Sequence, residues 1–222
     1  MVEVGVYRGE FASRVLKRCD SLEKYYMIDP WRHLDNWNKP ANLTDNIFEQ
    51  FLSETKSKTD FAEDKRIILR GKTTEVIEEV ADGELDFAYI DGDHTLKGIT
   101  IDLIRVYNKI RDGGCIGGDD FCKTVWQHGT EFEPTLVFPF ALYFAEAIGT
   151  RVYSLPYNQF LIEKTRPQNF SFVDLAGGYN DTTFTKQFRP DKVFKLWLAQ
   201  AFPSSAKFIK ILRRFIAKNE NL

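Results

Sequence analysis

The side chains best able to do chemistry stand where an apolar run of this sequence stops. Residues 87–90 are apolar, and Asp91, Asp93 and His94 follow them directly. An unbroken apolar run suits a strand that is covered on both faces of a parallel sheet. Because open α/β sheets bind ligands beyond the carboxyl ends of their strands, we expect these three side chains to line a binding site. A hydrogen-bonded loop histidine is the alternative interpretation of His94.

A second acidic pair repeats the pattern. The glycine-rich run at residues 113–118 ends in Asp119 and Asp120, and we expect a turn at 112–114 to lead into this strand. Two strand ends with carboxylates indicate one shared site. The alternative for this pair is a strand-end turn with helix-capping acids.

The start of the chain has the pattern acid-x-Gly-x-x-x-Gly, in which Glu3 precedes Gly5 and Gly9. We read it as a strand, a glycine turn and a helix over residues 10–18. Gly5 permits the turn, and Gly9 lets the helix begin close to a ligand. The spacing differs from the Gly-x-Gly-x-x-Gly of dinucleotide sites, which disfavours an oxidoreductase. Taken alone, the pattern also fits a tight strand-to-helix turn.

Residues 25–29 form another apolar run that ends in an acid, Asp29. An acid at this distance from a glycine turn can accept both ribose hydroxyls of an adenosine ligand, and Trp31 could cover an adenine face. A turn or helix-capping role before Pro30 is the alternative. Residues 31–44 are polar and rich in aromatics, so they form either a substrate-binding lid or a surface loop whose tryptophans fill the core.

The remaining elements follow in strand-helix alternation. We expect Thr73 to cap a helix, and a turn to join the last two strands. This order predicts a Rossmann-like three-layer α/β sheet, mostly parallel with one antiparallel strand near its C-terminal end. The expected strands are 66–71, 151–155 and 159–163, and the expected helices are 45–55, 97–110 and 138–148.

The C-terminal part differs in composition from the body. From Lys186 onward there are nine Lys or Arg and two acids, so the rest carries nine excess negative charges. We expect a sheet domain over 1–164 and an extension over 165–222, made of a loop arm and helices at 191–202 and 204–218. The last helix is basic and amphipathic, which suits an anionic membrane surface, the protein's own acidic body or a second subunit.

Composition sets the broad class. The 222 residues are 43% hydrophobic and 28% charged, typical of one globular domain with or without an appendage. A net charge of −2 gives no reason to expect a nucleic-acid partner. Three cysteines without metal-ligand spacing, and no signal or membrane-spanning run, predict a cytoplasmic protein. Because the chain opens on a strand, we expect either a longer natural chain or the loss of a preceding helix.

Together these pieces resemble class I S-adenosylmethionine-dependent methyltransferases. Within that class the chain is similar to the small-molecule O-methyltransferase group that includes macrocin-type sugar methyltransferases and cephalosporin-hydroxylase-like proteins. Each motif alone is common, whereas the combination is specific. The likeness covers residues 2–164, and its motifs are 3–9, 27–31, 89–94 with Gly98 and Asp102, and 117–120.

The resemblance implies roles for individual residues. A divalent cation, Mg²⁺ by expectation, would be held by Asp91, Asp119 and Asp120, and the base would be His94, with Asp91 as the second catalytic residue. Members of the group often associate, so a homo-oligomer is expected. S-adenosylmethionine would be bound by Glu3, Gly5, Tyr7, Gly9, Asp29, Trp31, Thr73 and Asp91.

Methyl transfer from a sulfonium needs an aligned acceptor and the removal of one proton. A hard cation on oxygen ligands lowers the pKa of a hydroxyl, and an imidazole can then take the proton. We therefore expect metal-assisted O-methylation of a small hydroxylated acceptor, such as a sugar or a natural product. The acceptor and the choice between O- and N-methylation stay open. A non-catalytic or differently catalytic protein, hydroxylase-like or bound to a membrane or partner through its basic tail, is the alternative.

Overall fold

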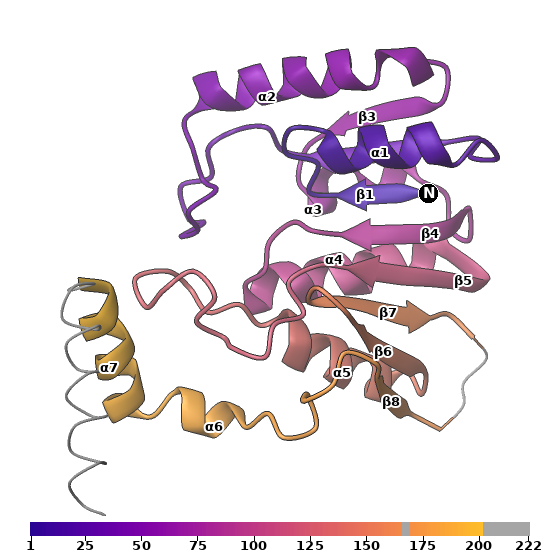
Figure 1. The fold of residues 1–222 in the computed structure, drawn as a ribbon. Helices are drawn as coiled ribbons and strands as arrows, with labels where there is room; N and C mark the ends of the chain where they lie inside the picture. The colour runs from indigo at the N-terminus through magenta and orange to yellow at the C-terminus, as the bar shows by residue number, and fades with distance from the viewer. Residues whose placement is uncertain (166–168, 202–222) are drawn as a thin grey trace, which may run out of the picture.

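The backbone forms one eight-stranded sheet in the computed structural model, which describes residues 1–165 and 169–201 (Figure 1). The strands lie in the order β3-β2-β1-β4-β5-β7-β6-β8. Within this described part, only β7 runs opposite to its neighbours β5 and β6. The predicted sheet with one antiparallel strand is therefore confirmed. The strands are β1 (Val2–Val4), β2 (Tyr25–Asp29), β3 (Arg66–Arg70), β4 (Leu85–Ile90), β5 (Ile110–Gly118), β6 (Arg151–Leu155), β7 (Gln159–Glu163) and β8 (Ser171–Asp174).

Helices cover both faces of the sheet (Figure 1). Side chains alternate along β2, so Tyr25 and Met27 pack with α1 and α2, whereas Tyr26 and Ile28 belong to the core beneath α4 and α5. All four are buried, which explains why β2 is an unbroken apolar run. The helices are α1 (Glu10–Arg18), α2 (Asp45–Lys58), α3 (Thr73–Val76), α4 (Leu96–Lys109), α5 (Val137–Ala147), α6 (Phe184–Gln187) and α7 (Pro190–Ala201), with short 3₁₀ turns at Asp60–Ala62 and Ile77–Glu79.

The start of α3 differs from the prediction. Lys72, not Thr73, is the residue that precedes the helix, and the Glu75 carboxylate accepts the Lys72 backbone N–H at 2.9 Å. Thr73 instead turns its hydroxyl to Asp102 of α4, at 2.5 Å. The capping prediction for Thr73 was wrong because that hydroxyl is used in a tertiary contact.

The predicted turn at residues 112–114 lies within β5 rather than before it, since β5 spans Ile110–Gly118. It is an irregularity of that strand: Leu85 is opposite Ile110 but Phe87 is opposite Cys115, and Gly113 has φ +80°. The Gly113 backbone N–H donates to the Lys164 carbonyl at 2.7 Å, and the Lys164 N–H donates to the Gly114 carbonyl at 2.8 Å. These glycines are thus drawn into the sheet by the chain that leaves β7.

The sheet continues past Lys164, where the sequence placed its end. β8 pairs with β6 in parallel register, Val152 opposite Phe172, so part of the expected loop arm is an edge strand. The helix predicted at 191–202 is confirmed as α7. The basic helix predicted at 204–218, with its proposed membrane or self-association role, lies outside the described residues. Among the residues described, no helix has the length and apolar character needed to cross a membrane.

Candidate active site

Strand register brings the predicted site residues to one edge of the sheet. Val4 of β1 is level with Ile28 of β2 and with Ile90 of β4, and Ile90 is level with Gly118 of β5. The residues that follow these four positions therefore leave the sheet side by side. They are Gly5, Asp29, Asp91 and Asp119.

Gly5 lets the ends of β1 and β4 lie in close contact. It has φ +88°, and a Cβ at this position would lie 2.0 Å from the Asp91 carbonyl oxygen. Only a glycine permits both the left-handed backbone and this close approach of the β1 and β4 ends. Gly9 also has a positive φ of 71°, but a Cβ there would meet Thr55 of α2 at 2.9 Å. Gly9 thus allows α1 to pack closely on α2. Contrary to the prediction, it does not line the cavity.

A cavity of about 640 Å³ opens beside these strand ends. Its volume lies within the roughly 300–1,000 Å³ typical of small-molecule sites. Most of the predicted site residues line it, whereas Gly9, Trp31, Asp119 and Asp120 do not. The predicted residues in its wall are Glu3, Gly5, Tyr7, Asp29, Thr73, Asp91 and His94.

Asp29 is fixed by the turn that it faces. Its carboxylate accepts the backbone N–H groups of Val6, Tyr7 and Trp31 at 3.0, 2.8 and 2.7 Å. Burial raises the pKa of Asp29, and the three N–H groups work against that rise. One carboxylate oxygen accepts only one of these bonds, so it keeps a lone pair for a ligand hydroxyl.

Trp31 does not take the adenine-covering position that the sequence suggested. Its side chain is fully buried among α1 and α2, and its indole N–H donates to the Tyr7 carbonyl at 2.8 Å. A positive φ of 39° at Trp31 turns the ring inward, away from the ligand edge. The neighbouring Pro30 and Arg32 line the cavity in its place.

Glu3 brings a buried carboxyl group into the cavity wall. It is 2% exposed and accepts the Tyr25 hydroxyl at 2.7 Å. Burial raises the pKa of Glu3 to about 8, although the Tyr25 hydrogen bond opposes this. A buried carboxyl of this kind is suited to hydrogen bonding with a polar ligand rather than to a surface ion pair.

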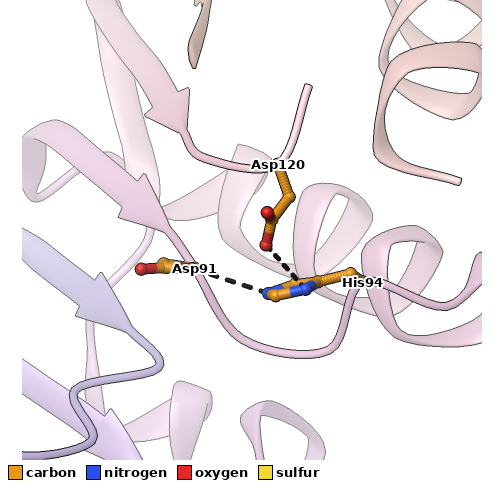
Figure 2. Close-up of side chains that lie close together, drawn as sticks. All are labelled: Asp91, His94 and Asp120. Carbon is orange, nitrogen blue, oxygen red and sulfur yellow. Dashed lines mark ion pairs between the residues drawn. The ribbon is translucent and has the colours of Figure 1, made fainter. Parts of the chain in front are cut away.

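His94 meets two carboxylates from different strand ends (Figure 2). Its Nδ1 lies 2.6 Å from an Asp120 carboxylate oxygen, and its Nε2 lies 3.5 Å from Asp91. Nε2 is buried and has no hydrogen-bond partner among the described residues. Burial alone would lower the pKa of His94, but the Asp120 and Asp91 carboxylates outweigh burial and raise it to about 9.

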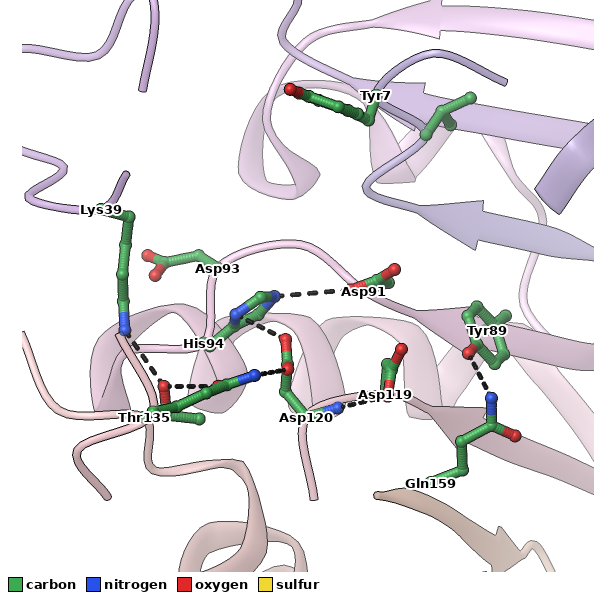
Figure 3. Close-up of polar contacts among 12 residues, drawn as sticks. Tyr7, Lys39, Tyr89, Asp91, Asp93, His94, Asp119, Asp120, Thr135 and Gln159 are labelled. Atoms are coloured by element: carbon green, nitrogen blue, oxygen red, sulfur yellow. Dashed lines mark hydrogen bonds and ion pairs between the residues drawn. The ribbon is translucent and has the colours of Figure 1, made fainter. Parts of the chain in front are cut away.

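Asp91, His94 and Asp120 are also a possible metal-binding group. Each offers one ligand atom, and these atoms lie within 4.8 Å of one another. Asp119 is not in this group, and its carboxylate accepts the Asp120 backbone N–H at 2.8 Å (Figure 3). Burial raises the pKa of Asp119 to about 6. The structure therefore places the imidazole of His94 where the sequence placed a third carboxylate.

The loop at residues 31–44 contributes one tryptophan to the core and another to the cavity wall, and its role as a substrate-binding lid stays a prediction. Trp31 fills the core, whereas Trp37 lines the cavity and donates its indole N–H to Asp93 at 3.0 Å. Lys39 reaches from the same loop to the Glu133 carbonyl at 2.8 Å. The loop thus closes one side of the cavity and is anchored to the segment after β5.

Three polar residues of the site escaped the sequence reasoning. Lys39 and His128 line the cavity, and Gln127 donates to the second Asp120 carboxylate oxygen. Burial lowers the pKa of Lys39 while Asp93 and Asp120 favour its charged form, and burial lowers the pKa of His128. None of the three stands in a recognisable motif, and only the abundance of polar residues in their loops signalled them.

Comparison with known protein families identifies the family of this chain. Residues 2–121 match the family described as "Methyltransferase domain", which spans more than half of the chain, so the protein belongs to this methyltransferase family. Comparison with curated proteins finds no significant match.

Solved structures with the same fold include several O-methyltransferases. A putative caffeoyl-CoA O-methyltransferase from Staphylococcus aureus has a TM-score of 0.56 and 14% identity, over 74% of this chain and 74% of that chain. An O-methyltransferase from Bacillus cereus in complex with SAH has a TM-score of 0.54 and 13% identity, over 74% and 73%. The O-methyltransferase NovP has a TM-score of 0.53 and 14% identity, over 75% and 72%. At these identities the likeness concerns the fold.

Proposed function

We propose that this methyltransferase uses S-adenosylmethionine to methylate a hydroxyl oxygen of a small acceptor. The proposal rests on the contacts made by the two ring nitrogens of His94. One ring nitrogen is held by Asp120, and the other is buried beside the cavity, without a hydrogen-bond partner among the described residues and 3.5 Å from Asp91. This arrangement suits a proton acceptor whose ring is oriented by a carboxylate.

The cavity residues fit S-adenosylmethionine, which supplies an electrophilic methyl group when bound. The open lone pair of Asp29 suits a ribose hydroxyl, and the buried carboxyl of Glu3 suits a polar group of the methionine part. The turn at Gly5 brings backbone rather than side chains to the ligand edge. Proximity to Asp91 and His94 would place the acceptor oxygen next to its proton acceptor.

His94 would take the proton of the acceptor hydroxyl through Nε2. Asp120 holds Nδ1 and stabilises the imidazolium that results. With a folded-state pKa of about 9, the ligand-free ring already carries a proton at neutral pH and must release it to solvent before it can accept another. Positive charge that enters the cavity favours this release, because like charges disfavour the imidazolium.

Metal assistance is the second part of the proposal. Two carboxylates and an imidazole are a donor set that divalent cations accept, so Asp91, Asp120 and His94 would hold the ion. Bound there, an ion would lower the pKa of an acceptor hydroxyl. The imidazole favours Mn²⁺ or another transition metal more than the Mg²⁺ expected from three carboxylates. An ion between Asp91 and His94 would make the imidazole a ligand, and the base would then be solvent or another group.

The test is methyl transfer to a panel of small hydroxylated compounds, including sugars and phenols, with S-adenosylmethionine as donor. Mass spectrometry should find an acceptor that gains a methyl group with the wild-type protein. His94→Gln should lose this product while binding the donor as before. Transfer to nitrogen acceptors only, or equal turnover by His94→Gln, would contradict the proposed chemistry.

A further inference from the structure

Lys39 is a lysine that the fold buries without a carboxylate partner. Its residue is 5% exposed, and its ammonium donates to the Glu133 carbonyl at 2.8 Å and to the Thr135 hydroxyl at 3.3 Å. Across residues 1–165 and 169–201, no carboxylate lies within ion-pair distance of it. A buried charge whose hydrogen bonds go only to neutral oxygens is costly, so its position calls for an explanation.

The two carboxylates that favour the charged form of Lys39, Asp93 and Asp120, already accept hydrogen bonds from other residues. Asp93 accepts the Trp37 indole N–H and the Thr95 backbone N–H, each at 3.0 Å. Asp120 is held by His94 and Gln127. An ammonium has three donors, and the two contacts of Lys39 leave one N–H for a further acceptor.

Lys39 lines the same cavity as the proposed proton acceptor. Lys39, His94 and His128 all line this cavity, and the two imidazole rings lie 6.1 Å apart between centroids. Figure 3 shows the Lys39 side chain descending from the loop at 31–44 toward Thr135, on the side of His94 away from Asp91. A ligand next to His94 would thus have a cation within the wall that surrounds it.

We propose that Lys39 binds a carboxylate of the acceptor, so that the acceptor is a hydroxylated carboxylic acid rather than a neutral sugar. The proposal rests on the proposed function, because it places the acceptor hydroxyl at His94. A single ammonium balances one negative charge. A dianion would leave a second charge facing Asp93 and Asp120, which disfavours a phosphate at this place.

The same lysine connects the acceptor to the proton acceptor. Lys39 donates to the Thr135 hydroxyl, Thr135 donates to the Gln127 amide oxygen at 2.9 Å, and Gln127 donates to Asp120 (Figure 3). Asp120 in turn orients His94. An anion that draws the Lys39 ammonium into place therefore also fixes the loop at 31–44 and the chain of hydrogen bonds that ends at the imidazole.

Benzoate and benzamide are the probes, because they share a shape and differ in charge. Each is titrated by calorimetry onto the full chain saturated with S-adenosylhomocysteine. We expect benzoate to bind at least about tenfold more tightly than benzamide, as a charge-assisted hydrogen bond predicts. Lys39→Gln keeps a donor for the Glu133 carbonyl without the charge and should remove this preference, whereas Lys39→Arg should keep it.

Lys192→Met is the matched control. Lys192 is an exposed lysine that lines a separate cavity under α7, so it should leave the preference for benzoate unchanged. Equal binding of the two probes, no binding of benzoate, an unchanged preference in Lys39→Gln, or its loss in Lys192→Met would each overturn the proposal. The saturation step reports on the proposed function separately, because failure to bind S-adenosylhomocysteine would refute that function whatever the probes do.

Discussion

The carboxylate of Asp120 holds Nδ1 of His94 at 2.6 Å and leaves Nε2 beside the cavity. The two residues come from the ends of neighbouring strands, β4 and β5. Asp120 has φ +57°, a left-handed conformation that Asp adopts more readily than most residues, and the Asp119 carboxylate accepts its backbone N–H. The Asp119 side chain is thus used to build the turn that aims Asp120 at the imidazole.

Removal of the Asp120 carboxylate, which orients the His94 ring, should slow the chemical step. Asp120→Asn leaves the shape of the turn intact but cannot stabilise an imidazolium. We expect turnover to fall by roughly 10²–10⁴, as for loss of a general base, with S-adenosylmethionine affinity unchanged. Single-turnover kinetics and calorimetry measure the two quantities. A variant that loses cofactor affinity and keeps its turnover would show that the pair serves binding instead.

Two substitutions within the site test which residues hold a metal ion. If Asp91, His94 and Asp120 hold a cation, His94→Gln should weaken Mn²⁺ binding by at least about tenfold, which electron paramagnetic resonance can measure. Asp119→Asn keeps an oxygen for the Asp120 N–H and should bind Mn²⁺ like the wild type. The reverse pattern, with Mn²⁺ lost only from Asp119→Asn, would restore the three-carboxylate site expected from the sequence.

Gly5→Ala should destabilise the fold strongly. The new Cβ would lie 2.0 Å from the Asp91 carbonyl oxygen in a backbone with φ +88°. Overpacking and left-handed strain together predict a loss of about 2–5 kcal/mol in the free energy of unfolding. Gly83→Ala is the matched control, because Gly83 has φ +69° and no atom within 4 Å of a Cβ. Denaturant unfolding should show a loss of only about 1 kcal/mol there. Equal losses at both positions would refute the close approach of β1 and β4.

Glu3 should make the ligand-free protein less stable as the pH rises. Its folded pKa of about 8 lies above the ordinary value of 4.5, so the folded state keeps a proton that the unfolded state has released. Stability therefore falls between about pH 4.5 and pH 8, by a few kcal/mol. Glu3→Gln should flatten this slope in denaturant unfolding, whereas Glu23→Gln on the surface should not. A wild-type stability that rises across this range would contradict a protonated Glu3.

The sequence was sufficient to predict the sheet and the edge at which the site lies. Apolar runs that stop at Asp29, Asp91 and Asp119 depend only on local pattern, and strand register then sets them side by side. The direction of an individual side chain was not predictable in this way. Trp31 is one residue away from a cavity-lining position on either side, and the backbone angle that turns it into the core comes from tertiary packing.

Contacts between distant segments were the least predictable. Gly9 faces Thr55, and Lys39 faces Glu133 and Thr135, because α2 and the loop after β5 lie where the fold places them. Likewise β8 has only four residues, and pairing with β6 rather than its own pattern makes it a strand.

Calorimetric titration of the full chain with S-adenosylmethionine tests most directly whether the cavity beside Gly5, Asp29 and His94 is a cofactor site. We predict saturable binding of one molecule per chain. Absence of any binding heat at millimolar ligand would contradict the assignment of this cavity and, with it, the enzyme that we propose.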